Sequence, residues 1–424
     1  MARRFWVNRA EISLEDFNLS EKDGRTLITP VKSKHTWAPN ELHLRSLLLD
    51  ADGYVLSSGF CKFVNIGEIP DHDFSLLEAM KGNGSVTYSA KEDGSLVIAS
   101  LIDGQPHYRT RGSHNLGIFE EPVMSLVYDK YPMVEVVLKH FGDNPRKVPM
   151  SFLFEYTAPT NQIVLKYGEP DLHFLGVMRL DTLHLSRVDI SKFSAIANAG
   201  GEGKRFFPKA AVFHDLPKNP ADLIKEVRSW VGKEGIVARI VLPEQDPVTG
   251  PVRLLKCKSD LYVKLHSLRF RLGGKVGKLA FLLGIESLAE APAKLETLGI
   301  DFEAQQFIQA ELEEYCEKLL YAQVAYGKFL GVCELIKENT LRDDLRTSRR
   351  NFVETVQEYI HVNDLPASFF GASMAWYSQK GADGWTHVVA AEVLDESAGT
   401  VKTWAITKDA ILNEMLHTPV DDDQ

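Results

Sequence analysis

The chain has 424 residues, 44% of them hydrophobic and 25% charged, with a formal net charge of −10. This composition is ordinary for a globular protein and excludes a collagen-like or wholly disordered chain, while the length provides for two domains or one large domain with an appendage. The negative charge argues against a protein that coats nucleic acid through overall electrostatics.

The N-terminal residues and the cysteines favour a cytoplasmic location. Residues 1–6 are basic but lack the apolar region of a signal peptide, and apolar runs such as 279–283 are far too short to span a bilayer. None of the four cysteines belongs to a CxxC pair, so we expect reduced thiols rather than disulfides or a zinc site.

Residues 1 to about 270 are predicted to mix strands and helices. Residues 47–56 and 96–110 each contain two apolar runs around an Asp-Gly turn, which is typical of a hairpin. Just before the second hairpin, the run Lys91-Glu92-Asp93-Gly94-Ser95-Leu96 places a primary amine beside another tight Asp-Gly turn. Lys-x-Asp-Gly alone is weak evidence, since ordinary residue frequencies produce it in roughly one chain in ten of this length. A plain turn lysine is the simplest alternative.

Three later segments carry charged side chains on apolar, strand-like runs. They are Phe152-Leu153-Phe154-Glu155-Tyr156, Lys233-Glu234-Gly235-Ile236-Val237-Ala238 and Leu254-Leu255-Lys256-Cys257-Lys258-Ser259-Asp260-Leu261-Tyr262. Taken one at a time, Glu155 fits a strand-end ion pair, Glu234 a simple turn, and Lys256 with Lys258 a solvated strand face. Together, and in this order with Lys91, they provide the residue types that covalent nucleotidyl transfer requires.

The chemistry demands a neutral amine at Lys91. An unperturbed lysine pKa of ~10.4 must fall by about three units before the free amine is populated near pH 7. One cation at ~5 Å, at an effective dielectric constant of ~20, contributes roughly 3 kcal/mol against protonation. Lys256 and Lys258 alternate on a strand and share a face, so we hypothesise that their charges, with a metal ion, keep Lys91 neutral. Glu155 and Glu234 are the carboxylates predicted to hold magnesium or ribose.

The last part of the chain has a different pattern. Between Pro251 and Lys278 there are eight cations and one anion, so we expect a polyanion to bind there. After Lys278 the pattern predicts helices, including a long amphipathic one whose apolar residues recur at spacings of four and three. Those residues are Ile308, Leu312, Tyr315, Leu319 and Ala322. Residues 385–394 and 401–406 are strand-like, but 363–424 remain unassigned as a whole.

These motifs resemble the bacteriophage-type ATP-dependent RNA ligases that join single strands, the first RNA ligase family of the covalent nucleotidyltransferase superfamily. The similarity covers residues from about 40 to 266. It is carried by Lys91-Glu92-Asp93-Gly94-Ser95-Leu96, Arg109-Thr110-Arg111-Gly112-Ser113, Glu155-Tyr156-Thr157-Ala158-Pro159-Thr160-Asn161-Gln162-Ile163-Val164, Glu234-Gly235-Ile236-Val237-Ala238 and Lys256-Cys257-Lys258-Ser259-Asp260-Leu261-Tyr262. The Ala-Pro-Thr-Asn-x-Ile-Val and Lys-Ser-Asp-x-Tyr extensions are the most specific of these.

The resemblance implies a role for each matching residue. Lys91 would become the lysyl-adenylate, Glu155 would hold the ribose and Glu234 would serve the metal. Gly94 would let the backbone approach the nucleotide. The implied catalytic residues are Lys91, Lys256, Lys258 and Glu234; the implied nucleotide-binding residues are Arg45, Lys62, Glu92, Gly94, Arg111, Glu155 and Tyr262; the implied metal ligands are Glu155 and Glu234.

Three residues depart from the family pattern. Arg111 stands where lysine is common, which keeps the charge but changes the geometry of a phosphate contact. Ser46 and Val64 replace the commoner glycine and aromatic residue. These departures concern binding detail rather than the reaction.

The expected fold is α+β: a nucleotidyltransferase domain of antiparallel sheets and helices in residues 1–270, then a mainly α-helical domain from 271 to about 362, with 363–424 uncertain. The helical pattern favours RNA ligases, because DNA ligases and capping enzymes carry a small β-barrel in that place. The implied reaction uses ATP as AMP donor and magnesium, or manganese in its place.

The implied substrate is single-stranded RNA with 5′-phosphate and 3′-hydroxyl ends, with cleaved tRNA as one candidate, and the implied role is RNA repair or processing. We expect a monomer without membrane contact, in the host cytoplasm if the chain is phage-encoded. The alternatives are a capping-type guanylyltransferase that uses GTP, and an RNA-binding scaffold without turnover.

Overall fold

The computed structural model divides into an N-terminal unit that reaches Val263 and a C-terminal unit that begins at Lys264. The division falls inside helix α6 (Asp260–Leu272), near the boundary expected at residue 270. The described residues are 4–31, 34, 36–82, 84–142, 148–199, 206–217, 219–242, 252–298, 300, 302–378, 385–386, 388–396, 400–401, 408, 411–412 and 415.

The N-terminal unit contains three sheets, and nearly all of their strand pairs are antiparallel. The strand orders are β1-β2-β3-β4, β10-β9-β7-β8 and β11-β6-β12-β13-β5, with a parallel pair only between β13 and β5 among the described strands. The strands are β1 (Phe17–Lys22), β2 (Arg25–Pro30), β3 (Leu47–Leu49), β4 (Val55–Ser58), β5 (Val64–Asn65), β6 (Ser85–Lys91), β7 (Ser95–Ile102), β8 (Gln105–Thr110), β9 (Met150–Thr157), β10 (Asp171–Arg179), β11 (Val212–Phe213), β12 (Gly235–Val241) and β13 (Arg253–Lys258).

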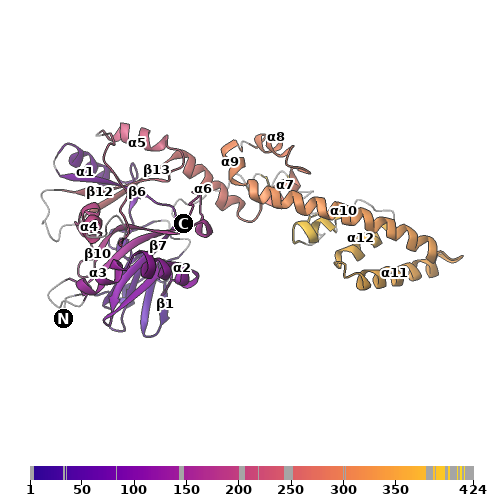
Figure 1. Ribbon diagram of the computed structural model, residues 1–424, viewed down its shortest axis with the longest axis horizontal. Helices are drawn as coiled ribbons and strands as arrows, with labels where there is room; N and C mark the ends of the chain where they lie inside the picture. The colour runs from indigo at the N-terminus through magenta and orange to yellow at the C-terminus, as the bar shows by residue number, and fades with distance from the viewer. Residues whose placement is uncertain are drawn as a thin grey trace. The chain divides into compact units, whose positions relative to one another are not determined.

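Helices cover one face of the sheet β10-β9-β7-β8 and one face of the sheet β11-β6-β12-β13-β5 (Figure 1). Phe152 and Phe154 of β9 belong to an apolar cluster with residues of α2, α3 and α4, whereas Ile236 and Leu255 of β12 and β13 pack with α1 and α5. The helices and short turns of this unit are η1 (Arg9–Glu11), η2 (Leu42–Arg45), α1 (Pro70–Met80), η3 (Gly117–Phe119), α2 (Glu120–Ser125), η4 (Leu126–Lys130), α3 (Met133–Gly142), η5 (Pro159–Asn161), α4 (Ile190–Ala197) and α5 (Pro220–Arg228).

The opposite faces of these two sheets meet each other. Ile98 of β7, Leu153 of β9 and Met178 of β10 are buried, and Leu254 of β13 packs against them. Because side chains alternate between the faces of a strand, Lys256 and Lys258 lie on the same face as Leu254. The strand pattern therefore directs both lysines toward the space between the sheets.

Both predicted hairpins are confirmed, but the expected Asp-Gly turn after Lys91 is wrong. β3 pairs with β4, and β7 pairs with β8 across Asp103 and Gly104, whose φ angles of 54° and 76° are left-handed. By contrast, β6 and β7 belong to different sheets. Residues 92–94 therefore carry the chain from one sheet to the other instead of closing a hairpin.

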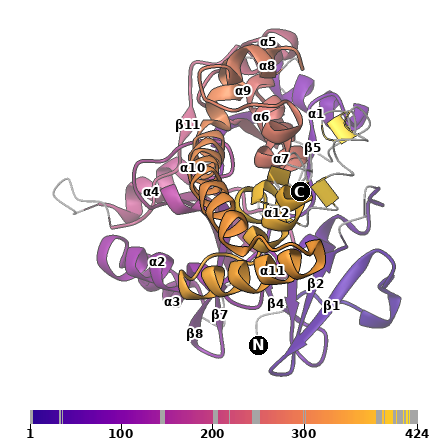
Figure 2. The same ribbon diagram turned by 90° about the vertical axis from the view of Figure 1, so that its right-hand side faces the viewer.

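The C-terminal unit is helical in its described residues. Helices α11 and α12 pack alongside α10 (Figure 2), where Phe329 meets Phe369 at a ring-centroid distance of 5.1 Å and Phe352 meets Tyr377 at 4.5 Å. The elements after α6 are α7 (Val276–Leu282), α8 (Ala291–Glu296), α9 (Phe302–Phe307), α10 (Gln309–Thr340), α11 (Leu345–Val362), α12 (Ser368–Tyr377) and η6 (Val389–Val393). The α+β class and the helical C-terminal region are thus as predicted.

Individual helix predictions had mixed outcomes. The amphipathic helix expected at 308–322 is confirmed within α10, where Leu312 and Leu319 are buried. Helix α6 begins well before Lys278, where the helical pattern was expected to start. The strand expected at 385–394 is wrong, because its described residues are helical and Val389 and Val393 enter the helical core. A short apolar run has no periodicity that separates a buried helix from a buried strand. Residues 402–406 lie outside the described residues.

Helix α10 is long and apolar enough, by length and composition, to cross a membrane, contrary to the expectation from the short apolar runs. Its apolar window is 28% buried, and one side of the helix packs in the core of the C-terminal unit. Core helices of helical bundles pass the same test, so this is weak evidence for a membrane-spanning segment.

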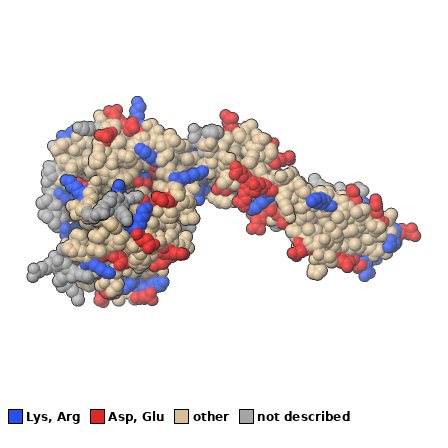
Figure 3. Space-filling view, viewed as in Figure 1, with Lys and Arg blue, Asp and Glu red and all other residues tan. Residues whose placement is uncertain are grey.

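The basic stretch from Pro251 to Lys278 does not belong to a single part of the fold. Arg253, Lys256 and Lys258 lie on β13 in the N-terminal unit, whereas the cations from Lys264 onward belong to the C-terminal unit. In the face shown in Figure 3, acidic and basic side chains alternate over the N-terminal unit, and acidic side chains gather near the start of α10. The local charge balance therefore describes two separate sets of cations.

Candidate active site

Strand register places Lys91 and Lys258 in one row across the five-stranded sheet. Gly235, the first residue of β12, pairs with Lys91 on one side and with Lys258 on the other. Directly opposed residues point to the same face, so both lysines and Lys256 share one side of the sheet. Gly235 has a φ of +155°, and an added Cβ would collide with the Cys257 carbonyl oxygen. Only glycine allows the three strands to approach at this row.

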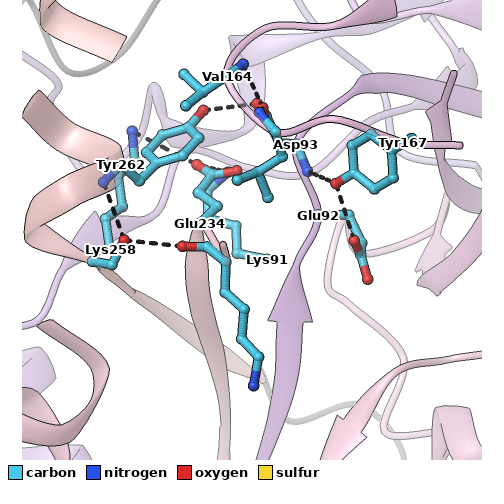
Figure 4. A network of polar contacts seen from close by, with 11 residues as sticks. Lys91, Glu92, Asp93, Val164, Tyr167, Glu234, Lys258 and Tyr262 are labelled. Carbon is cyan, nitrogen blue, oxygen red and sulfur yellow. Dashed lines mark hydrogen bonds and ion pairs between the residues drawn. The ribbon is translucent and has the colours of Figure 1, made fainter. Parts of the chain in front are cut away.

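Glu234 lies between the two lysines (Figure 4). Its Oε1 is 2.6 Å from Lys91 Nζ and 3.8 Å from Lys258 Nζ, and its side chain is 2% exposed. The backbone around it is fixed by Ser259, whose N–H donates to the Glu234 carbonyl at 2.8 Å and whose hydroxyl donates to the Lys233 carbonyl at 2.9 Å. The loop before β12 is therefore attached to the start of α6, and the carboxylate is held against Lys91.

The charges of Lys256 and Lys258 by themselves do not lower the pKa of Lys91; the hypothesis that they do so together with a metal ion stays a prediction. Burial lowers the pKa of Lys91, but the carboxylates of Glu234, Glu155 and Asp93 outweigh that effect and raise the pKa above its ordinary value. The nearest charge is the Glu234 carboxylate at 2.6 Å, and attraction at that distance favours the ammonium form. The contact with Glu234 therefore favours the protonated form of Lys91.

The amine that the cations do affect is Lys256. Burial, followed by the charges of Lys258, Arg45, Lys91 and Lys62, lowers the pKa of Lys256 to about 7. Its side chain lies on the same strand face as Lys258, two residues away. Lys256 thus stands in a strongly positive field, which an anionic group bound there would relieve.

Arg45 and Arg111 lie close enough to influence each other and Glu155. Burial and the charge of Arg111 lower the pKa of Arg45 to about 10, and Glu155 opposes this. Burial also lowers the pKa of Arg111, again opposed by Glu155. Lys62 is 8% exposed, and its Nζ lies 5.7 Å from the centroid of the Trp37 ring. The charges of Arg45 and Lys62 therefore act on Lys256, and the charge of Arg111 acts on Arg45.

Ser46, one of the departures from the family pattern, has a bridging role. The fully buried guanidinium of Arg109 donates to Ser46 Oγ at 2.8 Å and to the Ser46 carbonyl at 3.1 Å. Ser46 Oγ in turn donates to the Arg111 carbonyl at 2.7 Å. The Ser46 hydroxyl thus ties the segment after Arg45 to the end of β8 through two hydrogen bonds that a glycine would lack.

Glu155 projects from β9, in register with Leu96 of β7 and His173 of β10. Burial raises the pKa of Glu155 to about 8; Glu234, Asp93 and Glu92 add to the shift, and Lys91 opposes it. Burial and the neighbouring carboxylates thus favour the protonated form of Glu155 in the absence of a bound cation. Buried carboxylate oxygens of this kind suit magnesium, so Glu155 and Glu234 fit the predicted metal. Among the described residues, no group of three or more His, Cys, Asp or Glu side chains could hold a metal ion.

Asp93 organises the segment after Lys91, although the sequence did not single it out. It is 1% exposed, and its Oδ2 accepts hydrogen bonds from the backbone N–H groups of Val164 and Leu165, both at 2.7 Å. Its Oδ1 accepts the Tyr262 hydroxyl at 2.8 Å (Figure 4). One carboxylate therefore joins three of the motifs. The available signal was the aspartate within the Lys-x-Asp-Gly motif, whose presence turn chemistry alone also explains.

Glu92 and Tyr167 extend this network. The Asp93 N–H donates to Tyr167 Oη at 2.9 Å, and that hydroxyl donates to Glu92 Oε2 at 3.2 Å. His173 Nδ1 lies 3.7 Å from Glu92 Oε1, and its Nε2 lies 3.0 Å from Thr157 Oγ1. Glu92 is thus oriented by side chains from β10 and the loop before it.

Gly94 and Tyr262 have structural roles beside those that were predicted. A Cβ on Gly94 would collide with the Tyr156 carbonyl oxygen, so the glycine is needed for contact with β9 whether or not a nucleotide approaches. Tyr262 is 4% exposed and lies on α6, and Lys258 Nζ sits 5.3 Å from its ring centroid. The predicted site residues from Arg45 to Tyr262 all belong to the N-terminal unit.

The sequence matches the family model described as RNA ligase over residues 43–262, just over half of the chain. The chain belongs to the RNA ligase family. The matched range contains each residue predicted above as a site residue of this ligase, from Arg45 to Tyr262.

Solved RNA ligases resemble this chain more distantly. An archaeal ATP-dependent RNA ligase is 18% identical over 71% of this chain and 76% of its own, with a TM-score of 0.41. An apo mutant of the Naegleria gruberi RNA ligase is 12% identical over 49% of this chain, with a TM-score of 0.36. A mutant of the same enzyme with AMP and Mn is also 12% identical over 49% of this chain, with a TM-score of 0.34. The chain spans 57% of the length of that Naegleria apo chain.

Proposed function

We propose that this ligase joins 5′-phosphate and 3′-hydroxyl ends of single-stranded RNA, using ATP and a covalent AMP on Lys91. The observation that carries the proposal is the row Lys91, Gly235, Lys258 with Glu234 at 2.6 Å from Lys91 Nζ. It places one amine, its proton acceptor and two further lysines on one face of a sheet inside the range that matches RNA ligases.

In the first step, Lys91 must lose a proton before it attacks. Glu234 Oε1 is the group in contact with Lys91 Nζ, and it is positioned to accept that proton. The Nζ–phosphorus bond then forms as the bond between the α-phosphorus and the pyrophosphate oxygen breaks, in line with the attacking nitrogen. Lys256 and Lys258 neutralise charge on the α-phosphate, while Arg45, Arg111 and Lys62 neutralise the departing pyrophosphate.

The same groups serve the two later steps. A 5′-phosphate oxygen of the RNA attacks the AMP phosphorus, and Lys91 leaves as an amine and recovers its proton. A 3′-hydroxyl oxygen then attacks the 5′-phosphorus, loses its proton and displaces AMP. A divalent cation held by Glu155 and Glu234 would lower the charge on the reacting phosphates. Bidentate arginines and point-charge lysines suit phosphate oxygens at each stage.

The test is covalent labelling of the intact protein with radiolabelled ATP or GTP and magnesium. We expect a gain of one AMP on Lys91 by peptide mass spectrometry, complete loss in Lys91→Ala, and no label from GTP. Lys225→Ala, an exposed lysine on α5, is the matched control and should label normally. Labelling by GTP alone would indicate a capping-type guanylyltransferase, and an unlabelled wild-type protein would indicate a binding scaffold.

A further inference from the structure

A cavity of about 300 Å³ lies in the N-terminal unit beside the phosphate-binding cations. Its walls come from η2, the segment after β4, the loop after β10, the first turn of α1 and the start of β13. Phe60, Phe63, Met178 and Leu185 give it a mainly apolar lining, and Phe60 and Phe63 meet edge to face at a centroid distance of 6.0 Å. The proposed reaction at Lys91 does not use this space.

Lys62 and His72 are two polar residues among those that line the cavity. Lys62 is nearly buried, and its charge contributes to the field at Lys256. His72 Nδ1 is buried and has no hydrogen-bond partner within the described part of the chain. Arg253 holds this histidine in place, since its guanidinium donates to the Asp71 carbonyl at 3.0 Å and to Ser75 Oγ at 2.6 Å. The first turn of α1 is thereby fastened to β13, and the His72 imidazole lines the cavity.

The cavity borders the cations through two of its lining residues. Lys62 lines it directly, and Phe63 lines it while the Arg45 guanidinium lies 5.7 Å from the Phe63 ring centroid. A ligand that spans both places needs a phosphate at the cations and an uncharged aromatic group in the cavity. Burial lowers the pKa of His43, and burial with the charge of Arg253 lowers that of His72, so both lining imidazoles are neutral near pH 7. Neutral imidazoles suit a base better than a second phosphate.

The geometry of in-line attack at phosphorus indicates which nucleotide places its base in the cavity. Pyrophosphate leaves from the side of the phosphorus opposite Lys91 Nζ, and the RNA 5′-phosphate must later attack from that same side. The cations that bind the first group therefore meet the second, and the nucleoside attached to the 5′-phosphate continues beyond them. We propose that the cavity beside Lys62 binds the base of the 5′-terminal nucleotide of the strand that receives AMP. This rests on the proposed function.

The size and chemistry of the cavity limit the occupant to one base. Ligand pockets range from about 300 to 1,000 Å³, and this cavity lies at the lower limit. Aromatic side chains stack on any base, and Phe60, Phe63 and the His72 imidazole line this cavity. The subsite therefore strengthens binding of the donor end while it tolerates different bases.

The experiment separates AMP transfer from enzyme adenylylation. Lysyl-AMP protein is prepared first and then mixed with 5′-phosphorylated RNA whose terminal nucleotide is either normal or abasic. The variants are His72→Ala, which removes the ring nitrogen, and Val252→Phe, which fills the cavity from its partly exposed rim. His214→Ala is the control, since this histidine is exposed and does not line the cavity.

We expect the normal donor to require about a tenfold higher concentration for half-maximal AMP transfer in both cavity variants, as for loss of one base contact. The abasic donor should already require this higher concentration for half-maximal AMP transfer in wild type. The cavity variants should not raise that concentration further. The proposal is overturned if wild type does not distinguish the two donors, or if the variants match wild type. It is also overturned if the variants lose adenylylation by ATP, which would make adenine the occupant.

Direct binding of the same two donors, measured by fluorescence anisotropy, keeps the subsite testable even if wild type forms no lysyl-AMP. In that case the proposed function fails, whereas a preference for the normal donor that His72→Ala removes still supports the cavity. Equal affinity for both donors would overturn it.

Discussion

Lys91 and Lys256 carry the same amine, yet their surroundings shift their pKa values in opposite directions. Lys91 is in contact with a carboxylate, and Glu155 and Asp93 add to the effect, so its pKa is raised. Lys256 is buried among cations, so its pKa falls to about 7. A nucleotide changes both environments, because its phosphates add negative charge at the cations. The protonation of the two lysines is thus coupled to substrate binding.

One consequence is proton uptake when a nucleotide binds. At pH 8, Lys256 with a pKa of about 7 is mostly neutral, and a bound phosphate favours its ammonium form. Titration calorimetry with a non-hydrolysable ATP analogue, in buffers of different ionisation enthalpy, should show uptake approaching one proton per site. Lys256→Met should abolish it and Lys225→Met should retain it. A binding enthalpy independent of the buffer in wild type would contradict this prediction.

Glu155 should make stability depend on pH. Its pKa is about 8 in the folded protein and near 4.5 when unfolded, so between these values the folded state retains a proton that the unfolded state releases. Stability therefore falls as pH rises through this window. Glu155→Gln removes the effect and should raise Tm by about 2–4 °C at pH 8 but little at pH 4. Calorimetric scans at both pH values test this; an equal change at both would contradict the sign.

At the scale of elements, the site depends on how residues 92–94 connect two sheets. The crossover is held by Asp93, which joins the loop at Val164 to Tyr262 on α6. Gly94 and Gly235 allow backbones to approach on either side of it. The motifs are therefore not independent: each fixes the position of another.

Double-mutant analysis should reveal this coupling. Asp93→Ala leaves two buried N–H groups and one hydroxyl without their acceptor, which should cost about 3 kcal/mol of unfolding free energy. Tyr262→Phe removes one hydrogen bond and should cost about 1 kcal/mol. The double variant should lose less than the sum, as measured by urea unfolding. Strict additivity would show that the Asp93–Tyr262 bond contributes nothing, and the exposed Asp215→Ala serves as control.

At the scale of the molecule, the predicted site and the helical core belong to different units. Arg45 to Tyr262 lie before Val263, whereas the large helical cluster draws on residues from Leu268 onward. Each unit has its own buried apolar residues, as a domain requires. If the proposed function is right, we expect covalent adenylylation to need only the N-terminal unit.

A chain that ends at Leu272 retains all of α6 and tests that division. It should still form lysyl-AMP, because each predicted site residue is present, whereas strand joining should fall by about tenfold or more through lost RNA contacts. Label incorporation and a strand-joining assay on the same preparation measure both. Circular dichroism controls for folding, since removal of the helical unit exposes Leu268 and Leu272. Full joining activity in the shortened chain would show that the helices are dispensable.

The sequence alone determined the family and the residue types at the site, because short motifs with fixed spacing record which chemical groups a reaction needs. It also predicted the hairpins and the face shared by Lys256 and Lys258, which follow from local turn chemistry and the period of a strand. Only the tertiary structure decided the direction in which the pKa of Lys91 shifts, the position of Asp93 and the cavity lined by His72. These depend on distances between segments far apart in the chain, and electrostatic energy depends on such distances rather than on residue order.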